Sequence, residues 1–85
     1  MAKYSIPYTK DNLGKKDPLY GGILTDAATL PVGTTFYVCN GAWTGKVVEV
    51  DGKKAIRPNG GPPCLLFPEG SDDNILALSK IKKPD

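Results

Sequence analysis

The sequence lacks the side chains on which most acid–base and nucleophilic catalysis depends. It contains no histidine, whose ordinary pKa suits proton transfer near neutral pH. A Ser-His-Asp triad and a Cys-His pair are therefore excluded. The two cysteines, Cys39 and Cys64, have no neighbouring base in the sequence, and we interpret them as small buried residues. A disulfide between them is the alternative. We expect a protein that is not an enzyme and needs no cofactor.

Acidic residues gather at one point of the chain and raise the question of a metal site. Asp72 and Asp73 are adjacent and Glu69 is close, and paired carboxylates can hold Mg²⁺ or Ca²⁺. The alternating ligands of a calcium loop are absent, and a zinc site of the usual Cys/His type needs more ligands than this chain has. We interpret the cluster as a solvated turn or a helix start and expect no metal.

Basic residues carry the strongest hint of a binding surface. Asp51-Gly52 follows a strand-like run and suits a two-residue type I′ turn. That turn would place Lys46 opposite Arg57 on the face away from the core, with Lys53 at the far end of the same face. Like charges directly opposite each other destabilise a sheet unless a bound anion neutralises them. The alternative is that the two long side chains splay into water.

Two hairpins in series, over residues 34–57, would position these side chains. Asn40-Gly41 also suits a type I′ turn, which would place Val38 opposite Trp43. Strand alternation then gives a core face of Phe36, Val38, Trp43, Val47 and Ile56, with Glu49 and Lys54 paired at its tip. A bulge at Gly45 would exchange the faces beyond it. The predicted partner-binding residues are Tyr37, Thr44, Lys46, Lys53, Lys54 and Arg57.

The length and composition predict one small, mainly β domain over residues 1–85. Ten glycines and eight prolines among 85 residues favour short strands and frequent turns over long helices. We expect a small SH3-like barrel or compact β-roll built on a meander, with at most one short helix or 3-10 turn. Residues 1–22 would form an irregular arm or edge strand, residues 33–57 the meander, and residues 64–81 the closing strands.

Three local patterns refine this outline. Thr25 or Asp26 can cap a short helical turn that Pro31 ends. Residues 64–67 have the apolar character of a short buried strand. Residues 74–81 fit either a helix that begins after Ser71 or a closing strand, and the β context favours the strand.

The positions of Gly33, Val38, Gly41, Gly45 and Val47 within a hairpin meander resemble those of KOW-type SH3-like β-barrel domains. The resemblance covers residues 33–57. It implies a small barrel, and the domains of that family bind RNA, ribosomes or the transcription machinery.

Three hypotheses of function follow. The first is a protein-interaction module, such as a phage accessory or inhibitor protein, that acts by occupying a partner's surface. The second is a nucleic-acid-binding SH3-like domain with a basic β face, although a net charge of +2 is too small to mark the whole chain as a nucleic-acid binder. The third is a structural or decoration protein of a virion.

The expected partner is another protein, and nucleic acid is the alternative. The amino terminus has no apolar stretch like that of a secretory signal. No apolar run approaches the roughly 18 residues of a membrane span. We therefore expect no membrane contact and a cytoplasmic location, which is the host cytoplasm if the protein is encoded by a phage.

Overall fold

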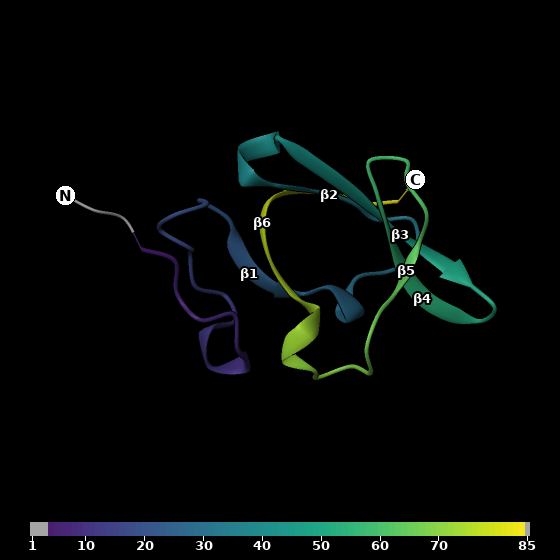
Figure 1. Cartoon of the computed structure of the whole chain (residues 1–85), viewed down its shortest axis with the longest axis horizontal. Helices are drawn as coiled ribbons and strands as arrows, with labels where there is room; N and C mark the ends of the chain where they lie inside the picture. Colours follow the sequence, from purple (N-terminus) through teal and green to yellow (C-terminus); the bar gives the residue numbers. More distant parts are fainter. Residues whose placement is uncertain (1–3, 85) are drawn as a thin grey trace.

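Six antiparallel strands form one curled sheet in the computed structural model, which describes residues 4–84 (Figure 1). The strands are β1 (Ile23–Asp26), β2 (Thr35–Val38), β3 (Trp43–Val50), β4 (Lys53–Pro58), β5 (Cys64–Leu65) and β6 (Ile75–Lys82). Helical structure is limited to four 3-10 turns, where the sequence predicted at most one: η1 (Lys10–Asn12), η2 (Ala27–Thr29), η3 (Cys39–Gly41) and η4 (Asp72–Asn74). The protein is mainly β, as predicted.

The last strand lies between the first two (Figure 1). The order across the sheet is β1-β6-β2-β3-β4-β5. The first half of β6 pairs with β1, and its second half pairs with β2. The register shifts beside Tyr37 and Val38, which lie opposite Lys80 and Leu78, so that Ser79 forms a bulge. The strand interpretation of residues 74–81 is confirmed.

The two predicted hairpins differ in their turns. The Asp51-Gly52 turn is as predicted, since both residues have positive φ and the register from Lys46–Arg57 to Val50–Lys53 is confirmed. The first connection is not a two-residue turn. It is the 3-10 turn η3, in which the Ala42 N–H donates to the Cys39 carbonyl. The longer connection is symmetric about the same midpoint, so Val38 still lies opposite Trp43.

The inner face of the sheet holds the main core. Leu30, Phe36, Val47 and Leu78 are buried together, and Val38, Ile56 and Leu76 pack against them. Phe36 lies opposite Gly45, and a Cβ at Gly45 would come within 2.5 Å of the Phe36 ring. The aromatic ring thus covers the glycine on the neighbouring strand. No register shift occurs at Gly45, so the predicted alternation of faces holds along β3.

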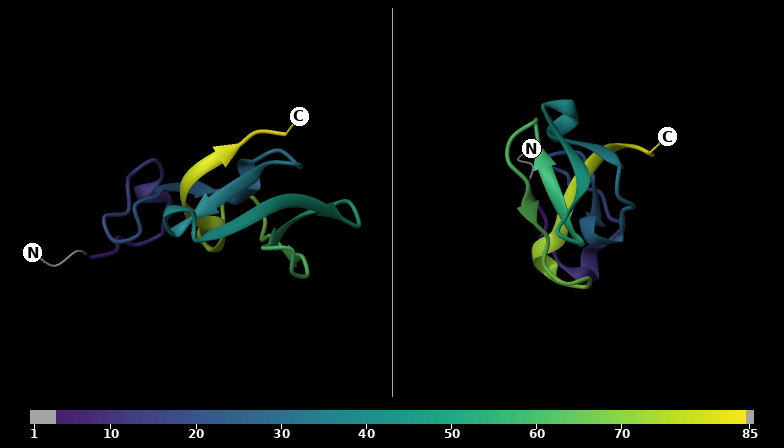
Figure 2. Two further views of the ribbon diagram at one scale, coloured as in Figure 1. Left: turned by 90° about the horizontal axis from the view of Figure 1, so that it is seen from above. Right: turned by 90° about the vertical axis from the view of Figure 1, so that its right-hand side faces the viewer.

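The outer face is covered only at one end, by the amino-terminal arm. Ile6 and Tyr8 pack on Leu24, Ile75 and Ala77, which form a second core on β1 and the first half of β6. Figure 2 shows this arm at the end of the molecule opposite the tip of the β3–β4 hairpin. The arm therefore leaves the outer face uncovered around Lys46 on β3 and Arg57 on β4, both of which are exposed.

A buried carboxylate holds the arm in place. Asp17 is fully buried and accepts hydrogen bonds from the Tyr8 hydroxyl, from Ser5 Oγ at 3.1 Å and from the Leu19 N–H at 3.0 Å. Desolvation pushes the pKa of Asp17 up, but these hydrogen bonds outweigh it and the pKa lies below the ordinary 3.8. Burial, followed by the bond to Asp17, raises the pKa of Tyr8 to about 12.

Several residues expected in the core lie at the surface. Trp43 is 54% exposed because it is the first residue of β3, at the end of the sheet beyond the core cluster. Of the buried strand predicted at residues 64–67, only the short edge strand β5 forms, and it is not buried: Leu65 on β5 and Phe67 just after it are more than half exposed. The cysteines are free thiols. Cys39 is partly exposed and Cys64 is exposed, so neither matches the buried interpretation.

Replacing Gly45 by alanine is expected to destabilise the protein by about 1–3 kcal/mol, because the new methyl group displaces the Phe36 ring from the core. Urea unfolding measures the loss. The shorter side chain of Phe36→Leu makes room for the methyl group, so the double variant should lose less stability than the two single losses combined. Additive losses would show that the ring and the glycine are not coupled.

Acid should release the clamp on the arm. Because the folded pKa of Asp17 is lowered, its contribution to stability is fully present above pH 3.8 and is lost as pH falls through the lower folded value. The Tyr8 contribution is present below pH 10 and is lost as pH rises through about 12. Asp17→Asn should cost about 1–3 kcal/mol at neutral pH. Denaturant unfolding should show this difference shrinking below pH 3.8, and a constant difference would contradict the assignment.

Candidate functional site

A row of cations crosses the open outer face of the sheet. Lys46 on β3 lies opposite Arg57 on β4, as predicted. On its other side Lys46 lies opposite Thr35 on β2, and Thr35 lies opposite Lys82 on β6. We call these four residues the basic row. Neighbouring strands are about 4.8 Å apart, so three exposed cations occupy a span of three strand spacings. Such repulsion is unfavourable without an anion.

A second row lies beside the basic row, two residues along the strands. It contains Lys80, Tyr37 and Thr44, which face one another across β6, β2 and β3. The Lys80 ammonium lies 5.9 Å from the centre of the Tyr37 ring, within the range of a cation–π contact. The face therefore combines cations, hydroxyl groups and a half-buried aromatic ring.

Two shallow hollows follow the basic row and share Thr35 and Lys46. The first, of about 280 Å³, lies toward β4 and is lined by Thr35, Thr44, Gly45, Lys46, Arg57, Asn59 and Gly60. The second, of about 390 Å³, lies toward β6 and is lined by Gly33, Thr35, Lys46, Lys82, Lys83 and Pro84. Neither set of described lining residues contains a carboxylate, so both hollows offer hydrogen-bond donors and positive charge.

The structure brings four of the six predicted partner-binding residues together and places the other two elsewhere. Tyr37, Thr44, Lys46 and Arg57 lie together on the outer face. Lys53 is exposed beside the Asp51-Gly52 turn, where it lines a different hollow. Lys54 belongs to the inner face and has a structural role.

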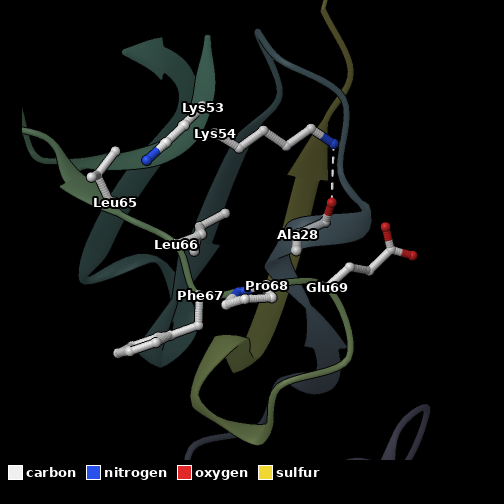
Figure 3. Close-up of a pocket in the computed structure, with 8 residues that line it drawn as sticks. All are labelled: Ala28, Lys53, Lys54, Leu65, Leu66, Phe67, Pro68 and Glu69. Atoms are coloured by element: carbon white, nitrogen blue, oxygen red, sulfur yellow. Dashed lines mark hydrogen bonds between the residues drawn. The ribbon is translucent and has the colours of Figure 1, made fainter. Parts of the chain in front are cut away.

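Lys54 joins the hairpin to the turn η2 (Figure 3). Its Nζ donates to the Ala28 carbonyl at 3.0 Å and to the Leu30 carbonyl at 2.9 Å. These carbonyls follow the cap that Asp26 provides through its hydrogen bond from the Ala28 N–H, which confirms the predicted Asp26 cap. Lys54 lies opposite Glu49 in the sheet, as expected. Its ammonium, however, donates its hydrogen bonds to the main-chain carbonyls at the end of η2.

Sequence reasoning missed Thr35, Lys80 and Lys82 as members of the face. The pairing of β2 with β6 joins residues 40 or more positions apart, and no local turn specifies it. A signal was nevertheless present. Lys80 and Lys82 are two positions apart in a strand, so alternation places both on one face. What the sequence could not specify was which strand lies beside them.

The acidic cluster is used in the fold. Asp72 Oδ1 accepts a hydrogen bond from the Lys10 N–H at 3.0 Å, and Ser71 Oγ accepts one from the Asp73 N–H at 3.2 Å. Within residues 4–84, no three Cys, Asp or Glu side chains come together in a group that could hold a metal ion. Over the same described range, the structure has no helix with the length and apolar character needed to cross a membrane.

Comparison with protein-family models, with curated proteins and with solved structures gave no match for this chain. The resemblance to KOW-type SH3-like domains therefore stays a prediction.

Replacing Lys54 by methionine is expected to cost about 1–3 kcal/mol of stability, because two main-chain carbonyls lose a charged donor. Lys53→Met is the matched control, since it removes the same charge one residue away at an exposed position and should change stability by less than about 0.5 kcal/mol. Urea unfolding of both variants measures this. Equal losses at the two positions would contradict a specific role for Lys54.

Proposed function

We propose that this protein is a non-catalytic binding module whose open outer sheet face binds nucleic acid. The observation that carries the proposal is the basic row, in which three cations lie on adjacent strand positions around Thr35. Half or more of the hydrogen bonds between proteins and DNA go to phosphate and sugar, chiefly from the side-chain types found here.

Three further features support nucleic acid as the ligand. The two hollows place several cations within reach of one polymer, and Lys83 extends the charge beyond the basic row. Tyr37 offers an aromatic ring beside the cations, and ring stacking contributes to binding of single strands. The arm covers the outer face only over β1 and the first half of β6, so the basic row is left uncovered.

Binding of a 20-nucleotide single strand is expected to weaken steeply with salt. Each phosphate contact contributes about 0.7 to the slope of log K against log salt for single strands, so three to five contacts predict a slope of about −2 to −3.5. Fluorescence anisotropy at several salt concentrations measures it. The triple variant Lys46→Gln, Arg57→Gln, Lys82→Gln should reduce affinity at least about tenfold and flatten the slope.

The matched control removes three exposed lysines away from the basic row: Lys15→Gln, Lys16→Gln and Lys53→Gln. It has the same net charge as the first triple variant, so general electrostatic attraction changes equally in both. Equal weakening by the two triple variants would refute a specific face, and no binding by the wild-type protein would refute the proposed function.

A protein partner is the second candidate, favoured by one specific observation. A hollow of about 480 Å³ beside β5 is lined in part by Leu65, Leu66, Phe67 and Pro68 (Figure 3). Exposed apolar side chains gathered in one place are typical of protein interfaces. An apolar segment of another protein is the occupant this hollow would take. A complex that survives nuclease and high salt would support this candidate over nucleic acid.

The remaining expectations stay predictions. They are the phage accessory or inhibitor role, the virion component and the cytoplasmic location.

A further inference from the structure

The hollow between Lys46 and the loop after β4 differs from the rest of the basic face because its wall is fixed by hydrogen bonds. Asn59 and Gly60 have φ of 42° and 77°, and the Gly61 N–H donates to the Pro58 carbonyl at 2.6 Å. Positive φ at both central residues is the geometry of a type I′ turn, and Asn-Gly is its preferred sequence. This turn gives the hollow a rigid edge.

The Asn59 side chain is locked onto the neighbouring strand. Its Oδ1 accepts from the Thr44 N–H at 2.9 Å and from Thr44 Oγ1 at 2.7 Å, and the main-chain N–H of Asn59 donates to the Thr44 carbonyl at 2.9 Å. Because Oδ1 is committed to Thr44, the Nδ2 amide is the side-chain group that Asn59 can offer to a ligand. That group is a donor only.

The same turn also orients Arg57. Arg57 Nε donates to the Gly61 carbonyl at 3.1 Å, which fixes one edge of the planar guanidinium and leaves its two terminal nitrogens for a ligand. Lys46 lies directly opposite on β3, and Thr35 lies beside Lys46 on β2. A guanidinium fork, an ammonium, an amide and a hydroxyl thus border one hollow without a carboxylate among its lining residues.

We infer that this hollow is a discrete phosphate-binding site, formed by Arg57, Lys46, Asn59 and Thr35. Phosphate suits it because a guanidinium can bind two phosphate oxygens at once, with the ammonium and the neutral donors left for the remaining oxygens. The inference deepens the proposed function and rests on it for the source of the phosphate, which is the nucleic-acid backbone. The other residues of the basic row would then attract the polymer, and this hollow would hold one of its phosphates at a defined position.

Inorganic phosphate is the probe that separates a discrete site from a diffuse patch. It is added at constant ionic strength while the amide resonances of Thr44, Asn59, Gly60 and Gly61 are followed by NMR. A discrete site predicts saturable shifts at these amides, with the apparent Kd for phosphate raised when the 20-nucleotide strand is present as a competitor. Shifts that grow linearly without saturation, or that spread over the whole surface, would overturn the inference.

Two conservative variants test the geometry. Arg57→Lys keeps the charge but loses the fork, and we expect at least a tenfold loss of phosphate affinity. Asn59→Asp keeps both acceptor bonds to Thr44 and keeps a residue that suits a type I′ turn, but replaces the donor by a negative charge. We expect it to abolish saturation with no change of fold, which the unchanged amide spectrum of the core would confirm.

Lys53→Gln is the control, because it changes the net charge by the same amount as Asn59→Asp and lies outside the hollow. It should stay within twofold of wild type. If both hollow variants also stay within twofold while the 20-nucleotide strand still binds, the discrete site is refuted and the proposed function stands. If phosphate saturates the hollow but the strand does not bind, the site stands and the proposed function fails.

Discussion

The pairing of β6 on both sides is the constraint on which the rest of the structure depends. Eight residues at the end of the chain insert between β1 and β2, which are the first two strands in the sequence. This insertion closes the inner core, because Leu78 joins Phe36 and Val47 there. It also ties the amino-terminal region to the meander, which follows it in the chain after η2 and a short turn. Such non-local pairing carries a loop-closure cost that the buried residues must offset.

The bulge at Ser79 determines how β6 serves both faces. Before it, Ile75 and Ala77 point to the outer face and are covered by the arm. After it, Lys80 and Lys82 lie on the outer face beyond the arm. One strand therefore contributes apolar residues where the outer face is buried and cations where it is open. Within this strand, the buried part of the outer face ends and the part that carries the candidate site begins. The hydrogen bonds to Asp17 hold the arm over the buried part.

The electrostatics of the open face contrast with those of the rest of the molecule. Lys54 uses its charge to satisfy main-chain carbonyls, and Asp72 accepts a main-chain hydrogen bond. In the basic row, Lys46 and Arg57 instead lie directly opposite each other, and Arg57 alone among its cations has a fixed hydrogen bond among the described contacts. Like charges at facing positions cost stability. An anion bound between Lys46 and Arg57 would relieve that cost.

Local features of the chain were predictable because a few neighbouring residues specify them. The Asp51-Gly52 turn fixed the register of β3 and β4, and with it the opposition of Lys46 and Arg57, since only a two-residue turn with positive φ connects these strands tightly. The Asp26 cap followed from the same kind of local chemistry. The inward positions of Phe36 and Val47 followed from alternation along strands whose register was known.

What tertiary structure alone decided is which surfaces are covered. Trp43 and Phe67 are apolar enough for a core, yet Trp43 lies where β3 begins and Phe67 lies just after the edge strand β5, and both remain exposed. Nothing in the local sequence distinguishes Lys54 from a surface lysine, but the fold brings the Ala28 and Leu30 carbonyls to its ammonium. Lys82 became part of the basic row only through pairing with Thr35, 47 positions earlier in the chain. The sequence by itself determined the Asp51-Gly52 turn, the register of β3 with β4 and the faces of those strands, because these depend on adjacent residues. Neighbours distant in sequence depend on the free energy of the whole assembled sheet, which no local pattern encodes.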